Sequence, residues 1–520
     1  MAVHAVHTSH IRLRKVTGFF VVESIVGRLI PELTTQEQVK LLWDGASASF
    51  KASLVTALEA LQSAPIMVLL KDFVLLMCGA LGSCKYSTKA LEDVVSGSRT
   101  RYHDLLLSAA TLKLTATVVK DDLQDAVQLK ADAQIREVTA LGLPLVLEGV
   151  QGANAAPPLT APFSSCVPSL MHQIRSYVED SVSYLRGLYS PWELPTAVFY
   201  YRNRMISKAV VEALQAKISS EANGQRPSGC MRMVANVWCL LQALDILDSW
   251  TLQQARANQE GDHQEASNAT SNTGSKADAA GLMGGAVRSR KAAAAQDTTA
   301  SNVQATLRTV QDVAERAVVR LVTTRVNNAL MEGFKACSWL PTGPLPPTKS
   351  PYVIELLQVV QETFSQAQAR LPRPSFLFLC RTVTHSMGGA FVKLFSPEGI
   401  VRAYNTFAIQ RLAADIADLQ SAVSGYGVQD IESEFSEASQ LCLLLLSEKV
   451  EDILVPEFRK QKYPNLGLAT IVLALDRYKE LAKVGKDKTN FPAKKALDAV
   501  AKQLRAQMVQ GPATRALQDF

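Results

Sequence analysis

The residues Thr384 to Gly389 read Thr-His-Ser-Met-Gly-Gly and come nearer to a catalytic motif than any other segment of the sequence. A serine in such a setting is typical of the nucleophile elbow of serine hydrolases, where it attacks a carbonyl carbon. The elbow requires glycine two residues before the serine, where this sequence has Thr384, and no histidine follows His385 to act as general base. Ser386 is therefore only a remote alternative as a catalytic residue.

Other chemistry is harder to find. The sequence contains no phosphate-binding loop and no HExxH zinc helix. His4, His7 and His10 share helical spacing, but a chain terminus rarely preorganises metal ligands. The eight cysteines are scattered singly, as expected for buried, reduced thiols. We predict no catalytic, cofactor-binding or metal-ligating residues, no cofactor, and a protein that is not an enzyme.

The net charge of +6 is small for 520 residues, but its distribution is uneven. Residues 457–505 hold 12 Lys or Arg and 5 acidic residues, a surplus of +7, so the rest of the chain sums to −1. A clustered set of lysines could contact an anionic membrane or an acidic partner. The alternative is a solvated helix face. The lysines are Lys483, Lys486, Lys488, Lys494 and Lys495. No interleaved aromatic and basic stripe suggests nucleic-acid binding.

The elements that carry these residues show helical periodicity, and the low counts of 27 Gly and 22 Pro also favour helices. Ser350 and Pro351 mark the start of one helix, which should end before Pro372. A second helix places Arg411, Asp415 and Asp418 away from an apolar stripe formed by Ile409, Leu412, Ile416, Leu419 and Val423. Residues 18–22 could form a strand or a helix. The sequence predicts an all-α fold of packed antiparallel helical bundles.

Breaks in composition divide the chain into three predicted bundles. They cover residues 1–150, 165–340 and 350–512, and residues 253–302 form a low-complexity insert that we expect to be disordered. No self-similarity appears at a period of 33 to 47 residues. Apolar runs are shorter than a membrane span needs, and neither terminus shows a secretory signal or prenylation box. We therefore expect a cytoplasmic protein.

An ordered series of segments resembles the C-terminal part of exocyst subunits of the Sec15 type. The series begins with Val16-Thr17-Gly18-Phe19-Phe20-Val21-Val22-Glu23 and ends with Lys502-Gln503-Leu504-Arg505. Between them lie 177–218, 325–330, 352–371, 376–420 and 463–465, in the order of the family. No single motif is specific, and the order of the series carries the resemblance.

The resemblance implies an elongated rod of stacked helical bundles. It also implies binding to other exocyst subunits and to a GTP-loaded Rab GTPase, and tethering of secretory vesicles to the plasma membrane before fusion. In the family a coiled-coil portion precedes this region, and Rab contact is placed in the C-terminal bundle. Arg411, Asp415 and Asp418 are the predicted partner surface, and their substitution should change stability little. A helical scaffold or adaptor outside the exocyst is the main alternative.

Overall fold

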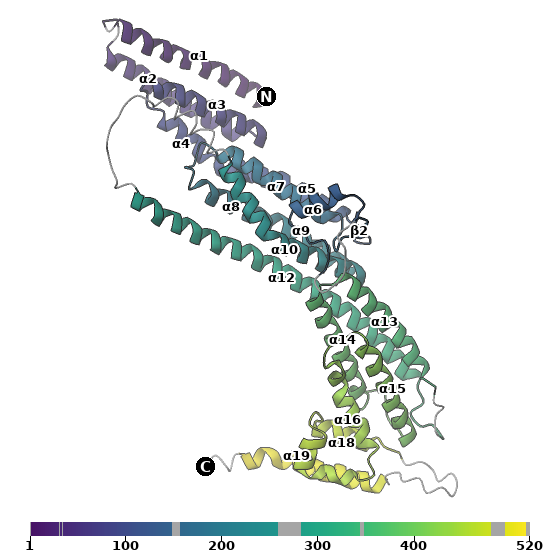
Figure 1. The fold of residues 1–520 in the computed structure, drawn as a ribbon. Coiled ribbons are helices and arrows are strands. Elements are labelled where there is room, and N and C mark those ends of the chain that lie inside the picture. Colours follow the sequence, from purple (N-terminus) through teal and green to yellow (C-terminus); the bar gives the residue numbers. More distant parts are fainter. Residues whose placement is uncertain are drawn as a thin grey trace. The chain divides into compact units, whose positions relative to one another are not determined.

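The computed structural model describes residues 2–30, 32–33, 35–147, 157–257, 282–343, 348–479 and 494–515 (Figure 1). The chain forms two compact units. Unit 1 comprises residues 1–146, 153–219 and 236–311, and unit 2 comprises residues 147–152, 220–235 and 312–520. Helices α10 (Pro227–Arg256) and α12 (Leu282–Ala336) contribute residues to both units.

In the part of unit 1 that the structure describes, the regular elements are helices and one short antiparallel ladder, in which Gln128 pairs with Thr160. Besides its parts of α10 and α12, its helices are α1 (Ala2–Leu29), α2 (Gln36–Ala60), α3 (Ala64–Ser83), α4 (Lys89–Gly97), α5 (Arg99–Lys120), α6 (Asp132–Ala140), α7 (Cys166–Leu185), α8 (Leu194–Met205), the π-helical η1 (Ile206–Val210) and most of α9 (Val211–Asn223). The strands are β1 (Gln128–Leu129) and β2 (Leu159–Thr160).

The regular secondary structure of unit 2 is helical among its described residues, apart from one isolated parallel bridge between Tyr404 and Tyr478. In addition to its parts of α9, α10 and α12, it contains α13 (Pro351–Arg370), α14 (Arg373–Lys393), α15 (Thr406–Ser424), η2 (Ile431–Phe435), α16 (Ser436–Leu445), η3 (Val450–Leu454), α17 (Pro456–Lys462), α18 (Leu468–Asp476) and α19 (Lys494–Arg515). Together the two units confirm the predicted all-α class.

Several local predictions can be compared directly with these bounds. Residues 18–22, which could have formed a strand, lie within α1. The helix expected after Ser350 begins at Pro351 and ends before Pro372. Helix α10 reaches Arg256 and α12 begins at Leu282, so both ends of the expected insert, residues 253–302, are helical. Alanine-rich sequence at the start of α12 favours helix. Residues 258–281 lie outside the described residues.

Among the described residues, two helices are long and apolar enough to cross a membrane, although the apolar runs of the sequence looked too short to do so. They are α3 and α10, with windows of mean hydropathy 2.0 and 1.4. In α10, 72% of that window is buried, and in α3 only 39% is. A core helix passes the same test, and burial accounts for α10 in this way. Helix α3 carries Lys71 and Asp72 near its centre, and Lys71 is buried against protein.

Lysine and arginine side chains from neighbouring segments cover several helix C-termini. The last carbonyl groups of a helix have no intrahelical partner and carry partial negative charge, so a cation satisfies them well. Arg101 donates to the carbonyls of Leu58 and Leu61 at the end of α2, at 3.1 and 2.9 Å. Lys71 donates to the carbonyls of Ser183 and Arg186 at the end of α7, at 2.8 and 3.2 Å.

The same arrangement recurs elsewhere in each unit. Lys217 binds the Asp121 carbonyl after α5, and Arg175 binds the Ala140 carbonyl at the end of α6. In unit 2, Arg477 donates to three carbonyls after α14, those of Leu394, Ser396 and Val401. A left-handed glycine is the usual way to end a helix. Left-handed glycines do follow two of these helices, Gly142 after α6 and Gly187 after α7, so the cations, which are distant in sequence, act in addition to that ending.

His103 gives unit 1 a pH-dependent stability that can be measured. It is buried in α5, where Nδ1 donates to the Arg99 carbonyl at 2.8 Å and the ring stacks on Tyr201. Burial lowers the pKa of His103 to about 4. The hydrogen bond to the Arg99 carbonyl and the charge of Asp104 act against this shift, and the charge of Arg204 adds to it. The unfolded chain, with a histidine pKa of about 6.5, therefore binds a proton that the folded state excludes.

Unit 1 should accordingly lose stability as the pH falls from 6.5 towards 4. The expected loss from His103 between pH 7 and pH 5 is about 2 kcal/mol. Urea unfolding of the parent and of His103→Phe at both pH values measures the difference. The phenylalanine variant should lack this part of the pH dependence, and equal slopes for the two proteins would contradict the assignment.

Candidate partner surface

Helix α15 carries the predicted partner surface and is fixed at its start by Asn405. The Asn405 side chain caps the helix by accepting from the amide of Ala408 at 3.1 Å. The backbone amide of Asn405 donates to the Trp339 carbonyl at 3.2 Å, and its side-chain amide donates to the Pro341 carbonyl at 2.7 Å. The predicted apolar stripe from Ile409 to Val423 is buried. One cap residue therefore positions both α15 and the segment after α12.

The polar residues of α15 are tied to the start of α13 by four side chains, which we call the Asp415 cluster: Ser350, Tyr352, Arg411 and Asp415. Asp415 accepts from the Tyr352 hydroxyl at 2.7 Å and from the Ser350 hydroxyl at 2.8 Å. Arg411 Nε lies 2.6 Å from Ser350 Oγ and 3.2 Å from Asp415 Oδ1. The hydroxyl of Ser350 thus accepts from a cation and donates to a carboxylate.

Burial sets the electrostatics of the cluster. Desolvation raises the pKa of Asp415, although hydrogen bonds from Tyr352 and Ser350 and the charge of Arg411 act in the opposite direction. Burial and the charge of Asp415 also raise the pKa of Tyr352, so its hydroxyl remains protonated and donates. The cluster therefore holds two helices together through neutral donors and one ion pair, at a cost in desolvation.

Glycine at position 333 allows Tyr352 to reach this cluster. A Cβ atom at Gly333 of α12 would lie 2.4 Å from Tyr352 Cβ, which no real contact permits. The close approach lets the base of the tyrosine lie against α12 while its hydroxyl reaches Asp415. Ser350 occupies the N-cap position of α13, as its sequence indicates, but makes no side-chain cap bond to that helix because its hydroxyl is engaged by Asp415 and Arg411.

The prediction that Arg411, Asp415 and Asp418 together form an open surface is wrong for Asp415, which is 2% exposed. Arg411 is also mostly covered, with a side chain 15% exposed. Asp418 is 34% exposed and lies 3.7 Å from Lys349. The helical pattern placed Asp415 outside the apolar stripe but gave no sign of Ser350 and Tyr352, more than 60 residues away in sequence. The Arg411 and Asp415 spacing of four was the one signal of pairing.

The family described as "Exocyst complex subunit Sec15 C-terminal" matches residues 90–477. This chain belongs to the Sec15 family. The Sec15 match includes the whole Asp415 cluster and leaves α1 to α3 and α19 outside it.

Individual relatives agree with the Sec15 assignment. Exocyst complex components SEC15A and SEC15B of Arabidopsis thaliana are 25% and 24% identical to this chain, over 95% and 94% of its length. The chain spans 59% and 58% of the lengths of those two proteins. A crystal structure of a Sec15 C-terminal domain is 16% identical, with a TM-score of 0.37, over 68% of this chain and 98% of that one. A myosin V cargo binding domain is 10% identical, with a TM-score of 0.38, over 78% and 86%.

Ser386, the remote catalytic alternative, lies inside α14 of this Sec15 chain. Its hydroxyl contacts the side chain of Asn327 in α12, at 3.0 and 3.4 Å, and His385 bonds instead to Glu434 at 2.8 Å. Neighbouring helical residues point about 100° apart, so His385 and Ser386 diverge. The strained turn of a nucleophile elbow is not present at this position.

The two glycines of the same segment have different structural roles, which gives a matched test. A Cβ at Gly388 would lie 2.3 Å from the Glu434 carbonyl oxygen, whereas a Cβ at Gly389 would meet nothing within 4 Å. Gly388→Ala should destabilise the chain by about 1–3 kcal/mol through overpacking, and Gly389→Ala should stabilise it by up to about 1 kcal/mol. Urea unfolding measures both. Equal effects of the two changes would contradict this packing.

Of the lysines predicted to meet an anionic surface, Lys494 and Lys495 lie in the first turn of α19. Lys495 is exposed on the side of α19 opposite buried Leu497 and Leu504. Lys483, Lys486 and Lys488 lie outside the described residues.

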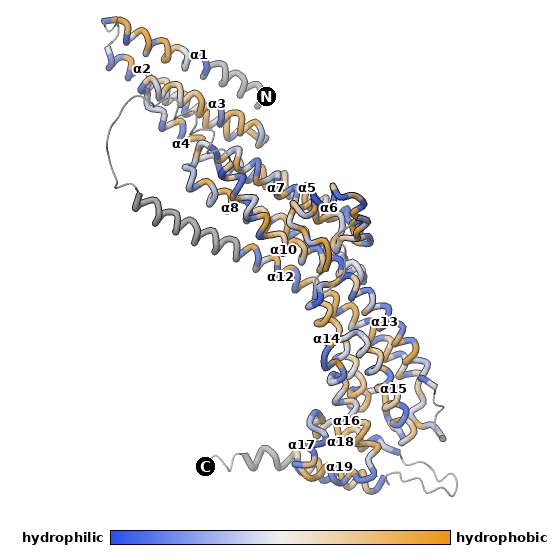
Figure 2. The backbone as a smooth tube through the Cα atoms, in the orientation of Figure 1, coloured by the Kyte–Doolittle hydropathy of each residue, from blue (hydrophilic) through white to orange (hydrophobic). Residues whose placement is uncertain are grey.

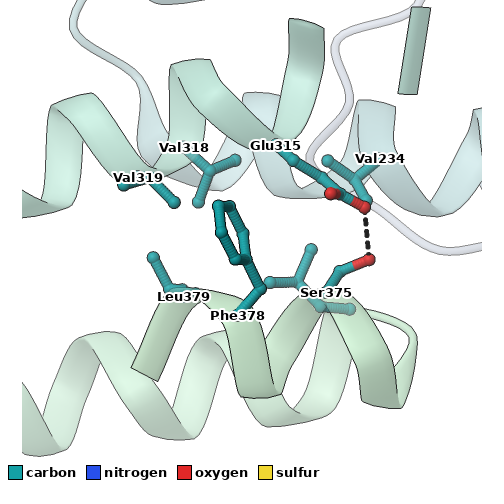
Figure 3. A pocket seen from close by; sticks show the side chains of 8 residues that line it. Val234, Glu315, Val318, Val319, Ser375, Phe378 and Leu379 are labelled. Carbon is teal, nitrogen blue, oxygen red and sulfur yellow. Dashed lines mark hydrogen bonds between the residues drawn. The ribbon is translucent and has the colours of Figure 1, made fainter. Parts of the chain in front are cut away.

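A small hollow in unit 2 was not predicted from the sequence. It lies between α12 and α14, and Figure 3 shows Phe378 of α14 pointing towards Val318 of α12. At one side Ser375 donates to the Glu315 carboxylate at 2.6 Å. The lining is otherwise apolar: Val234, Val318, Val319, Leu371, Phe378 and Leu379. Among the residues that the structure describes, no group of three or more His, Cys, Asp or Glu could hold a metal ion.

Proposed function

We propose that this chain is part of an exocyst subunit that tethers secretory vesicles at the plasma membrane and acts as an effector of a GTP-loaded Rab GTPase. The observation that carries the proposal is the Sec15 family match over residues 90–477. The chain spans about three fifths of its Arabidopsis relatives, so partners of the whole proteins are part of the proposal. Helical packing held by internal polar networks supports a role in binding rather than in chemistry.

The Asp415 cluster changes where the Rab surface is placed within this proposal. Asp418 stays in it because it is partly exposed on α15 beside Lys349, and Arg411 stays in it because part of its side chain is exposed on the same helix. Asp415 supports that surface from beneath by holding α13 against α15. The proposed partner surface therefore comprises Lys349, Arg411 and Asp418. Asp415 does not contact the partner but keeps α13 and α15 in the arrangement that presents this surface.

Affinity capture tests this proposal. The full chain is incubated with cell extract and with Rab GTPases locked in the GTP or GDP state, and bound exocyst subunits are scored together with bound Rab. We expect capture of at least one Rab in its GTP state only, with other exocyst subunits. Recovery of neither would favour an adaptor outside the exocyst.

The surface itself is tested by charge. Lys349→Ala, Arg411→Ala and Asp418→Ala should each weaken Rab capture, and Lys495→Ala on α19 is the matched exposed control. If all three variants capture Rab as the parent does, the surface lies elsewhere.

The basic residues of α19 are proposed instead to contact anionic lipid, and Lys495→Ala should lower binding to phosphatidylserine vesicles.

A further inference from the structure

Helix α1 packs against α2 and α3. Among its residues 14–29, only Phe20 is fully buried, with its ring 5.0 Å from the ring of Trp43 on α2. Val16, Thr17, Glu23, Ser24 and Gly27, all partly covered, lie on the same side of the helix as Phe20. The side of α1 that faces its own bundle therefore mixes apolar and polar residues.

The opposite side of α1 is apolar and open. Val22, Ile25 and Leu29 are 58%, 51% and 75% exposed, and Leu29 lies about 180° around the helix from Phe20. We call these three residues the α1 stripe. Figure 2 shows this part of α1 as largely hydrophobic. A helix that is apolar on its outer side is typical of one covered by a further element.

The spacing of the residues in the α1 stripe indicates what kind of element could pack on it. The α1 stripe has intervals of three and then four residues, which is the seam along which one α-helix packs on another in a coiled coil. Phe19 and Ile30, which are 55% and 53% exposed, extend apolar surface beside and beyond it. A single helix laid along α1 would bury the stripe over its whole length.

The exposed charged residues of α1 indicate the charge that a partner helix should carry. The exposed charged residues of α1 from position 14 onward are Arg14, Lys15 and Arg28, all basic, while Glu23 is partly covered and has interactions of its own. A second copy of α1 would bring like charges together. An acidic helix would place opposite charges along both edges of the stripe, which favours correct partners and faster association.

We propose that the α1 stripe binds an amphipathic helix of a protein partner whose apolar seam is flanked by acidic residues. This inference stands on α1 alone and goes beyond the Rab surface on α15, because α1 lies outside the region matched to the Sec15 family. The mode is helix against helix, with apolar anchors supplying affinity and the basic edge supplying selectivity.

The probe is a synthetic four-heptad peptide with leucine at positions a and d and glutamate at e and g, which repels its own copies at neutral pH. Its binding to the full chain is followed by fluorescence anisotropy. The triple variant Val22→Ser, Ile25→Ser, Leu29→Ser should weaken binding by about tenfold or more. The matched control is Leu112→Ser with Val119→Ser on α5, which removes exposed apolar side chains elsewhere and should leave binding unchanged.

A charge exchange completes the test. The triple charge variant is Arg14→Glu, Lys15→Glu, Arg28→Glu. It should bind the glutamate peptide more weakly than the parent does, and it should bind the same peptide with lysine at e and g more strongly. Circular dichroism confirms that each variant keeps its helices.

Three results would overturn the proposal. The first is peptide binding that is absent or indifferent to the α1 stripe. The second is that the chain does not bind the peptide but binds phosphatidylcholine–phosphatidylserine vesicles, and that the serine variant loses this vesicle binding. The third is a dimer in sedimentation that the serine variant dissociates. Rab capture is scored on the same variants and should be unchanged, so failure of this inference is separable from failure of the proposed function.

Discussion

Asp248→Ala is expected to lower the free energy of unfolding by about 3 kcal/mol. Asp248 pairs with Arg202 at 2.5 Å, and the Arg202 side chain is 1% exposed. Burial already lowers the pKa of Arg202, and the charge of Asp248 opposes that effect. The variant would leave a guanidinium group in the core of unit 1 with only the neutral partners Asn203 and Thr251. We expect the lower end of the range for such pairs because Asp248 is 30% exposed and partly solvated.

Urea unfolding, followed by circular dichroism, measures this loss. Asp245→Ala is the control, because Asp245 lies one turn earlier on α10 and is exposed. It should change stability by less than about 0.5 kcal/mol. Similar small effects for both positions would show that Arg202 finds another partner and would refute the assigned role of Asp248.

Asp415→Ala is expected to cost about 2–3 kcal/mol. Burial raises the pKa of Asp415 and so offsets part of what its ion pair with Arg411 contributes. Most of the loss comes from the buried Tyr352 hydroxyl, which would lose the acceptor that it has in the structure. Asp418→Ala, at a partly exposed ion pair, should cost less than about 1 kcal/mol.

A double-mutant cycle separates the orphaned donor from other effects. Tyr352→Phe removes the hydroxyl, so adding it to Asp415→Ala should recover part of the loss, and the two changes should not be additive. Additive losses would show that the Tyr352 to Asp415 bond does not contribute as described. Rab capture by Asp415→Ala, measured at a temperature where the chain is folded, then reports whether α13 positions the partner surface.

Helix positions were the part of the fold that local sequence could predict. Ser350, Pro351 and Pro372 mark the ends of α13 correctly, and the stripe from Ile409 to Val423 is buried in α15. These features depend on neighbours within a few residues, where capping and periodicity act. The start of α12 was missed because polar, alanine-rich sequence satisfies the criteria for both helix and low-complexity linker.

The candidate site was less accessible to prediction because its partners are distant in sequence. Asp415 looked like a surface residue since only its place on α15 was visible. Ser350 and Tyr352, which bury it, come from α13 and its cap, and Gly333, which makes room for Tyr352, comes from α12. Periodicity shows which residues leave the apolar face of a helix. It does not show which of the remaining residues meet another helix.

The cations that close helix ends also affect how this chain can be divided. The Sec15 match begins at residue 90, yet Lys71 on α3 satisfies two carbonyls at the end of α7. A recombinant fragment cut at residue 90 would leave that end of α7 open inside the protein and would remove the α2 carbonyls that Arg101 binds. Expression boundaries for this part of the chain should therefore be placed upstream of α2, where hydrogen bonding rather than sequence similarity sets the limit.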